Sequence, residues 1–350
     1  MRFSTFDQRL ADFGALPVHR GRITRVWLKG QPLDIGTRRR QSEDFLPLTL
    51  RRAIPALTDE LNGLASIHSE HAGDDGSRLL VKLADGQMLE TVLLPRGGLC
   101  VSTQIGCAVG CRFCMTGKSG LIRQVSSMEI LAQVVLARRM RAVKKVVFMG
   151  MGEPAHNLDN VLEAIDLLGS EGDIGHKNLV FSTVGDRRVF DALPRQRVKP
   201  ALALSLHTTK AELRQHLLPR APKITPEELV ELGEEYARNT GYPIQYQWTL
   251  LKGINDGDDE LDAVVQLLKG KYGVLNVIPF NSLEGDDYQR PDAERTREIV
   301  RFLHRHGVLS KIRNSAGQDV DGGCGQLRAR AVNDKKTIKL HPSQQNSKNP

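Results

Sequence analysis

The chain has 350 residues, which suits one large domain with a small appendage better than two or three small domains. Its formal net charge of +8 favours a polyanionic partner such as nucleic acid, although basicity alone does not separate nucleic acid from an anionic membrane. No apolar stretch approaches the roughly 20 residues that span a bilayer, and the polar start MRFSTFDQRL lacks a signal peptide's apolar core, so we expect a soluble, cytoplasmic protein.

The sequence predicts that residues 1–80 form a small accessory region ahead of the main domain. This region opens with basic residues and continues with helical apolar spacing from Leu48 to Leu64. The basic residues are Arg20, Arg22, Arg25, Lys29 and the run Arg38, Arg39 and Arg40. Such a run usually forms a solvated surface, and contact with phosphate is the alternative.

A hairpin is predicted in the segment KLADGQMLETVLLP. Asp85 and Gly86 lie there between two apolar, strand-like runs. An Asp-Gly pair is a strong hairpin signal because the tight turn needs residues that accept positive φ. Glu90 would then lie on the second strand.

From about residue 98, short β-rich runs alternate with helical ones. This pattern is typical of βα units that build a parallel sheet. The predicted strands are Leu99 to Gln104, Lys145 to Met149, Leu179 to Ser182, Ala201 to Leu206, Ile244 to Leu250, Val274 to Ile278 and Leu309 to Arg313. We therefore expect an α/β core over residues 81–330, and a disordered polar tail over residues 331–350.

Two helix starts can be identified between these strands. Ser126 and Glu129 have the spacing of a capping box. Thr225, Pro226 and Glu228 combine a cap, a first-turn proline and a capping-box partner.

The cysteines are clustered, with four of the five between positions 100 and 114. Cys107, Cys111 and Cys114 form a CxxxCxxC motif just after a predicted strand. Thiolates are the usual ligands of iron–sulfur clusters. Three thiolates leave one iron of a [4Fe-4S] cluster open, and S-adenosylmethionine (SAM) can chelate that iron. The alternative is a structural zinc site with Cys100 as fourth ligand, although a second CxxC-like knuckle is missing.

Polar or glycine-rich residues follow several of the predicted strands. They are Gly152 and Glu153, Ser182, Ser205 to His207, and Asn281. Each has a simpler explanation alone: Gly152 suits a turn, and His207 suits a satisfied half-buried histidine. Together they predict a polar rim beside the cysteine loop, as an amino acid headgroup, a ribose and an adenine would need.

The ordered motifs from Glu90 to Arg328 resemble the RlmN/Cfr family of radical SAM RNA adenosine methyltransferases. They are LETVLLP, CVSTQIGCAVGCRFC, FMGMGEPAHNLDNV, STVG, LSLHTTKAELRQHLLP, LLKGINDG, VIPFNSLEG and DVDGGCGQL. The resemblance implies a partial (β/α)6 barrel that carries the cluster at its open end. It also implies that the accessory region helps to bind RNA.

The resemblance also implies roles for individual residues. Gly152 and Glu153 would contact the SAM headgroup, and the remaining SAM site would comprise Ser182, Ser205, Leu206, His207 and Asn281. Cys324, otherwise a lone buried cysteine, resembles the family's methyl-carrying cysteine. Cys100 resembles the thiol that resolves the intermediate, and Glu90 resembles the general base.

In the implied scheme, one SAM methylates Cys324 and a second yields a 5′-deoxyadenosyl radical that takes a hydrogen from the S-methyl group. The carbon radical adds to an adenine ring carbon, C2 before C8, in ribosomal or transfer RNA. Glu90 then deprotonates the ring carbon and Cys100 attacks the sulfur of Cys324, leaving a disulfide. A reductant protein would serve the cluster and this disulfide, and we expect a monomer.

Two hypotheses compete with this prediction: a radical SAM enzyme for another substrate, such as a protein, and a zinc-stabilised RNA-binding protein without catalysis. The chain also departs from the family pattern in two places. Gln247 replaces an expected acidic residue, and Arg313-Asn314-Ser315 replaces a more basic stretch.

Overall fold

The computed structural model describes residues 1–36, 41, 43, 45–118, 120–281 and 287–329. The strands are β1 (Ala65–Ala72), β2 (Ser77–Leu83), β3 (Met88–Leu94), β4 (Gly98–Cys100), β5 (Gln104–Gly106), β6 (Leu121–Gln124), β7 (Lys145–Phe148), β8 (Leu179–Thr183), β9 (Ala201–Ser205), β10 (Ile244–Leu250), β11 (Gly273–Pro279) and β12 (Ser310–Ile312). The α-helices are α1 (Phe3–Asp12), α2 (Pro17–Leu28), α3 (Leu48–Gly63), α4 (Met115–Lys118), α5 (Ser127–Met140), α6 (Leu158–Ser170), α7 (Arg187–Ala192), α8 (Ala211–Leu217), α9 (Pro226–Thr240), α10 (Asp258–Leu268) and α11 (Ala293–Arg305).

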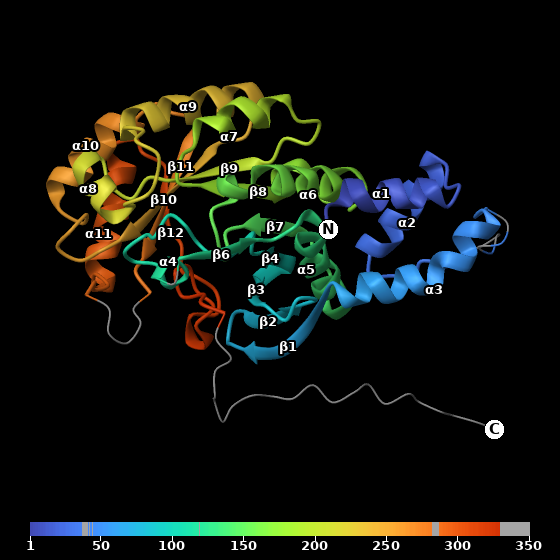
Figure 1. Ribbon diagram of the computed structural model, residues 1–350. Coiled ribbons are helices and arrows are strands. Elements are labelled where there is room, and N and C mark those ends of the chain that lie inside the picture. The colour runs from blue at the N-terminus through green and yellow to red at the C-terminus, as the bar shows by residue number, and fades with distance from the viewer. Residues whose placement is uncertain (37–40, 42, 44, 119, 282–286, 330–350) are drawn as a thin grey trace.

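One curved sheet organises the molecule. Its order is β1-β2-β3-β4-β7-β8-β9-β10-β11-β12, and every neighbouring pair from β4 to β12 is parallel. Helices α5, α6, α7, α9, α10 and α11 follow successive parallel strands and lie outside the sheet (Figure 1). The described chain is therefore the α/β, partial-barrel architecture that was expected, with the strands' carboxyl ends at one edge.

The parallel strands are buried on both faces, and their sequences reflect this. Leu179, Val180 and Phe181 of β8 are fully buried, as are Leu202 and Ala203 of β9. Such continuous apolar runs are typical of strands covered by helices on one side and by barrel contents on the other.

The predicted hairpin and helix caps are confirmed. β2 and β3 pair antiparallel around Asp85 and Gly86, and Glu90 lies on β3. The Ser126 and Glu129 capping box is complete, and the Thr225 side chain accepts a hydrogen bond from the main-chain nitrogen of Glu228.

The predicted strand from Leu99 to Gln104 is wrong as one element, because it divides into β4 and β5. The Gln133 side chain bonds both the nitrogen and the oxygen of Ser102, each at 2.9 Å, between the two strands. The Gln133 amide thus makes the two main-chain hydrogen bonds that a neighbouring strand would otherwise make. The chain turns there toward the cysteine loop.

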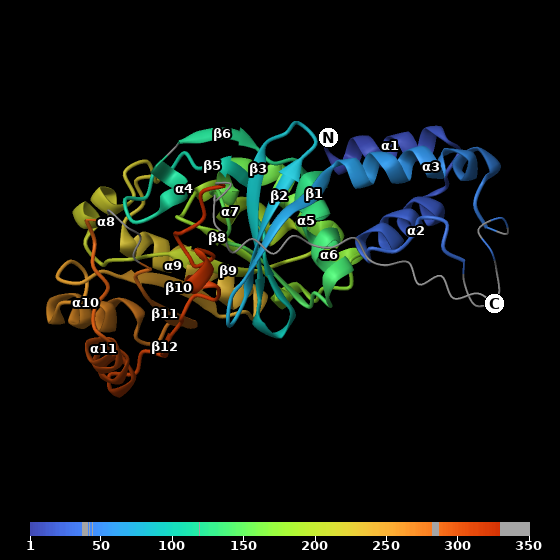
Figure 2. The same ribbon diagram turned by 90° about the horizontal axis from the view of Figure 1, so that it is seen from below.

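The accessory region divides differently from the expected boundary at residue 80. That position falls inside β2, which pairs with β1 and β3 and so continues the main sheet. Within the described residues, α1, α2 and α3 are the helices that lie to one side of the barrel, beside α5 and α6 (Figures 1 and 2). The run Arg38 to Arg40 and the predicted tail over residues 331–350 lie outside the described residues.

Candidate active site

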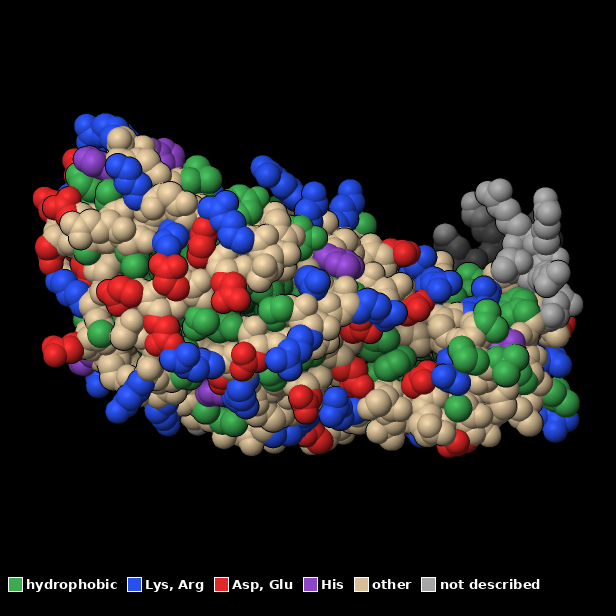
Figure 3. All heavy atoms as spheres, turned by 90° about the horizontal axis from the view of Figure 1, so that it is seen from above, with side chains coloured by type: hydrophobic (Ala, Val, Ile, Leu, Met, Phe, Trp, Pro, Cys, Tyr) green, Lys and Arg blue, Asp and Glu red, His purple; other side chains and the backbone are tan. Residues whose placement is uncertain are grey.

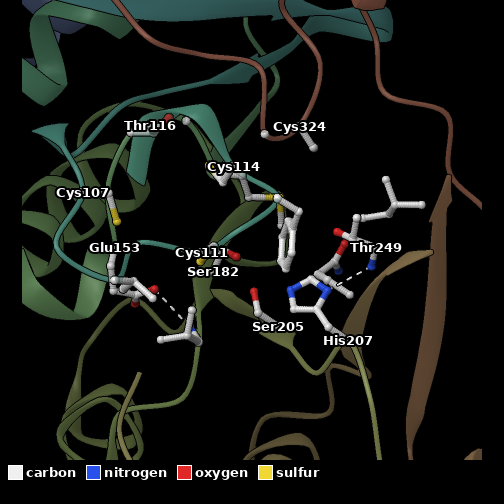
Figure 4. A pocket seen from close by; sticks show the side chains of 18 of the residues that line it. Cys107, Cys111, Cys114, Thr116, Glu153, Ser182, Ser205, His207, Thr249 and Cys324 are labelled. Atoms are coloured by element: carbon white, nitrogen blue, oxygen red, sulfur yellow. Dashed lines mark hydrogen bonds between the residues drawn. The ribbon is translucent and has the colours of Figure 1, made fainter. Parts of the chain in front are cut away.

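A cavity at the carboxyl ends of the parallel strands gathers most of the predicted site. It encloses about 930 Å³, including space open to solvent. The predicted residues in its wall are Cys107, Cys111, Cys114, Gly152, Glu153, Ser182, Ser205, His207, Asn281 and Cys324. These residues come from strand ends and loops that are separate in the sequence and converge only in the folded chain; Figure 4 labels eight of them, all except Gly152 and Asn281.

The cysteine loop leaves β5 through glycines that no other residue could replace. Gly106 has φ +75°, and a Cβ there would overlap the main-chain oxygen of Gly120. Burial raises the pKa of Cys107 to about 11 and also raises the pKa of Cys111 and Cys114. Without a cation or metal, the three thiols are therefore protonated at neutral pH.

Hydrogen bonds to the sulfurs of Cys107 and Cys114 partly offset the effect of burial on the thiol pKa. The main-chain N–H groups of Val109 and Gly110 lower the pKa of Cys107, and the hydroxyl and N–H of Thr116 lower that of Cys114. Donors aimed at cysteine sulfur are characteristic of iron–sulfur sites, where they stabilise the anionic ligands. The donor set therefore fits a cluster held by the three thiolates.

Cys100 lies apart from Cys107 and Cys111. It is 8 % exposed and lines a second cavity, while Cys107 and Cys111 line the first and Cys114 lines both. Among the described residues, no three His, Cys, Asp or Glu side chains, those of Cys107, Cys111 and Cys114 included, are close enough to hold a single metal ion. Cys100 is close enough to Cys324 for the charge of one thiolate to act on the other.

Glu153 presents a buried carboxylate to the first cavity. It accepts hydrogen bonds from the main-chain nitrogens of Ala155 and Val184, both at 3.1 Å. Burial raises its pKa to about 7 despite these donors. The preceding Gly152 has φ +102°, and a Cβ there would meet Gln104 at 2.5 Å. Glu153 is thus held where an ammonium group in the cavity would restore its charge.

His207 is a neutral hydrogen-bonding group. Its Nδ1 accepts from the main-chain nitrogen of Thr249 at 2.9 Å (Figure 4), and burial lowers its pKa to about 3. The ring contacts Phe113 edge-on, with centroids 4.9 Å apart. The residue has φ +63°, an unusual backbone for a side chain of this size. His207 therefore offers an Nε2–H donor and no proton to transfer near neutral pH.

Asn281 connects the barrel to the loop that carries Cys324. Its side-chain nitrogen donates to the Ser315 hydroxyl and to the main-chain oxygen of Cys324, both at 3.0 Å. Its side-chain oxygen is buried and has no partner among the described residues. The unpaired oxygen leaves Asn281 one acceptor for a ligand, because buried polar groups are normally bonded.

Cys324 is brought to the cysteine loop by main-chain bonds around it. The nitrogen of Met115 donates to the oxygen of Gly325 at 2.7 Å, and the Thr116 hydroxyl donates to the oxygen of Leu327 at 2.6 Å. Figure 4 shows Cys324 on its own loop, facing Cys114. Cys324 lines both cavities, and Cys100 lines the second one. The wall between the cavities therefore carries Cys324.

Two predicted residues lie elsewhere. Leu206 is packed in the core and is not part of either cavity wall. Glu90 is fully buried and pairs with Arg78 at 2.5 Å, and it also accepts from the main-chain nitrogen of Arg328 at 2.7 Å. In this arrangement the Glu90 carboxylate fastens the end of the Cys324 segment to β3.

The structure places two arginines at the site, neither of which the sequence assigned to it. Arg214, in the helical stretch ELRQHLLP, is buried beside the site, and Arg313 lines both cavities. Arg313 donates to the Gln247 side chain at 3.0 Å, so the two departures from the family pattern contact each other. An arginine in an amphipathic helix gives no sign of burial, and contact between distant positions cannot be predicted from either alone.

Known proteins resemble this chain over most of its length. The profile of the radical SAM superfamily matches residues 101–268. A probable RNA methyltransferase of Bordetella avium (strain 197N) is 83% identical, covering 97% of this chain and 97% of its own. Another from Pseudomonas aeruginosa PAO1 is 70% identical, covering 95% and 96%. The crystal structure of a radical SAM methyltransferase from Sphaerobacter thermophilus matches with TM-score 0.81 and 31% identity, covering 94% and 98%.

Proposed function

Because this chain belongs to the radical SAM superfamily, whose members use a [4Fe-4S] cluster and SAM, we propose that it is an RNA methyltransferase. Its product would be an adenosine of ribosomal or transfer RNA methylated on a ring carbon, C2 before C8. The names of the full-length relatives support RNA as the substrate class. The net charge of +8 is consistent with a polyanionic substrate.

The observation that carries the proposal is the position of Cys324 between two cavities. The first cavity holds the three clustered cysteines and the polar rim, so it would bind the cluster and SAM. The second cavity reaches Cys100 and encloses about 890 Å³, including space open to solvent. A base taken out of the RNA stack could enter it from solvent. A sulfur in the shared wall could receive a methyl group on one side and deliver it on the other.

An electrophilic ring carbon explains why a carrier thiol is needed. Such a carbon cannot attack the methyl group of SAM as an ordinary nucleophile would. A cluster held by Cys107, Cys111 and Cys114, together with SAM bound at the polar rim, would supply the radical chemistry that activates the methyl group. Cys324 would hold the methyl carbon near the base, and Cys100 would displace the product by attacking the sulfur of Cys324. The resulting disulfide needs two electrons from an external dithiol before the next turnover.

Glu90 remains our proposed general base, and its contacts set a condition on that role. A base must reach the proton that it removes. Here its carboxylate is occupied by Arg78 and by the main-chain nitrogen of Arg328. The segment after Cys324 would therefore have to move before Glu90 could act on bound RNA.

Two cysteine variants test the covalent scheme. We expect Cys324→Ala to bind a cluster and SAM but to form no methylated RNA. We expect Cys100→Ala to accumulate a protein–RNA adduct, visible as a nuclease-resistant mass on the peptide that contains Cys324. Normal methylation by Cys324→Ala would contradict the scheme. Iron and sulfide content of each variant provides the control, because both substitutions lie outside the proposed cluster ligands.

Mass spectrometry of RNA nucleosides from cells without the gene tests the substrate. The loss of one methyladenosine would identify the modified carbon. An unchanged nucleoside profile together with a loaded cluster would favour another substrate, such as a protein. Stoichiometric zinc and no iron in anaerobically purified protein would favour the non-catalytic alternative.

A further inference from the structure

Arg214 is a buried cation without an anionic partner. It lies in α8, and its exposed fraction is 3 %. One guanidinium nitrogen donates to the main-chain oxygens of Val184 and Ser205, while Nε has no partner. Among the described residues, no carboxylate lies within ion-pair distance of this side chain. Buried charges are normally paired, so this arrangement needs an explanation.

The surroundings of Arg214 indicate where the missing anion would lie. Val184 and Ser205 line the first cavity together with Cys111 and Glu153. Cys111 and Glu153 are also the two groups whose negative charge would act on Arg214. The guanidinium therefore lies directly behind the wall that carries these two side chains.

Arg214 supplies a fixed positive charge at this wall. Burial lowers its pKa to about 10, so the guanidinium stays charged at neutral pH. The buried guanidinium, bonded among the described residues only to the main-chain oxygens of Val184 and Ser205, therefore leaves its charge available to an anion in the first cavity.

We propose that Arg214 is a positioning residue that balances the charge of the cluster and thereby favours its reduced state. The inference rests on the proposed cluster ligands Cys107, Cys111 and Cys114, and it does not depend on RNA as the substrate. Cluster binding converts three thiols to thiolates, and reduction adds a further negative charge. A fixed cation in a site of low dielectric stabilises the reduced form more than the oxidised form.

A purely structural role is the competing explanation. Arg214 joins the ends of β8 and β9 through Val184 and Ser205, so its loss could simply loosen these strands. The two roles respond differently to charge. Arg214→Lys keeps the charge but replaces the planar guanidinium with a shorter ammonium side chain, whereas Arg214→Gln and Arg214→Met remove the charge.

The test is a dithionite titration of the anaerobically loaded full-length protein, followed by electron paramagnetic resonance of the reduced cluster. At a fixed potential, we expect Arg214→Gln and Arg214→Met to have a reduced-to-oxidised ratio at least tenfold below wild type. Tenfold corresponds to 59 mV for one electron. We expect Arg214→Lys to stay close to wild type. Thermal melts and iron content verify that each variant is folded and loaded.

Arg220→Gln is the matched control. The Arg220 guanidinium lies over Gly110 in the cysteine loop, but the residue is exposed and water screens its charge. We expect only a small shift in its reduced ratio. Equal ratios in wild type and both loaded neutral variants would overturn the inference, as would an equally low ratio in Arg214→Lys. RNA methylation is assayed separately, and its absence in loaded wild type would count against the proposed function alone.

Discussion

The buried Glu153 carboxyl group, which we propose to bind SAM, makes the folded protein less stable at high pH. Its carboxyl is fully enclosed, and its pKa is raised from 4.5 to about 7 by burial. A raised carboxyl pKa means that the folded state binds the proton more tightly than the unfolded chain. The associated stabilisation is complete below pH 4.5 and is lost as the pH rises through about 7.

We therefore predict that Glu153→Gln stabilises the protein that lacks cluster and SAM at pH 8, by about 3 kcal/mol at most. At pH 4.5 the free energies of unfolding of the variant and the wild type should be nearly equal. Urea unfolding at both pH values measures the difference. A stability difference that does not change with pH would show that the raised pKa is wrong.

The same substitution should weaken SAM binding. A neutral amide cannot pair with the ammonium group of the SAM headgroup, and we expect at least a tenfold loss of affinity, about 1.4 kcal/mol. Calorimetric titration of cluster-loaded protein with SAM measures it. Unchanged affinity would remove Glu153 from the proposed headgroup site.

The segment that carries Cys324 is positioned by contacts with several other elements. It lacks regular secondary structure over most of its length and is held by bonds to β3, to Asn281 just after β11, and to α4. Gly323 leaves little room for a side chain beside the barrel. A Cβ there would lie 3.0 Å from the Asn281 side-chain nitrogen, which is held by two hydrogen bonds, and 3.2 Å from the Cβ of Ser315.

We predict that Gly323→Ala displaces Cys324 and lowers methylation by roughly tenfold or more, because small displacements of reacting groups are costly. Gly63→Ala is the control, since nothing lies within 4 Å of a Cβ at that position. Activity of both loaded variants at equal cluster content measures the effect. Wild-type activity in Gly323→Ala would mean that the segment is free to shift.

Gln133 is another residue on which an element depends. Its side chain bonds the main chain of Ser102 and accepts from the Thr91 hydroxyl at 2.8 Å, all of them buried. We predict that Gln133→Leu costs about 2 kcal/mol or more, since it leaves buried groups unpaired. Chemical denaturation measures the change in the free energy of unfolding. Wild-type stability in Gln133→Leu would contradict this prediction.

The elements with regular periodicity could be predicted from the sequence, and the break in β4–β5 could not. Strands such as β8 and β9 are buried on both faces, so their nearly continuous apolar runs locate them within a residue or two. The break after Cys100 depends on Gln133, a residue 31 positions away from Ser102. Likewise, the CxxxCxxC spacing predicts a metal site, but the burial of Arg214 and Glu90 depends on contacts with other elements.

At the scale of the whole molecule, the distribution of charge differs from what the basic opening suggested. Arg20 pairs with Asp7, Arg25 with Glu171, and Lys29 with Asp173. Figure 3 shows basic and acidic side chains interspersed over the face that it presents. In the described part of the chain, no helix is long and apolar enough to cross a membrane.

We predict that Arg25→Ala and Lys29→Ala change RNA affinity less than twofold, because acidic partners already neutralise these cations. Each should cost at most about 1 kcal/mol of stability, as is usual for exposed ion pairs. Filter binding and thermal melts measure the two effects. A tenfold loss of RNA affinity would instead identify this face as a phosphate-binding surface.

SAM with a fully deuterated methyl group tests whether Cys324 carries the methyl group to RNA. It is supplied to the loaded enzyme together with RNA and a reductant. Nucleoside mass spectrometry should find a methyladenosine that has lost one deuterium to 5′-deoxyadenosine and gained a solvent proton. A product that keeps every deuterium would mean direct transfer from SAM and would contradict a carrier role for Cys324.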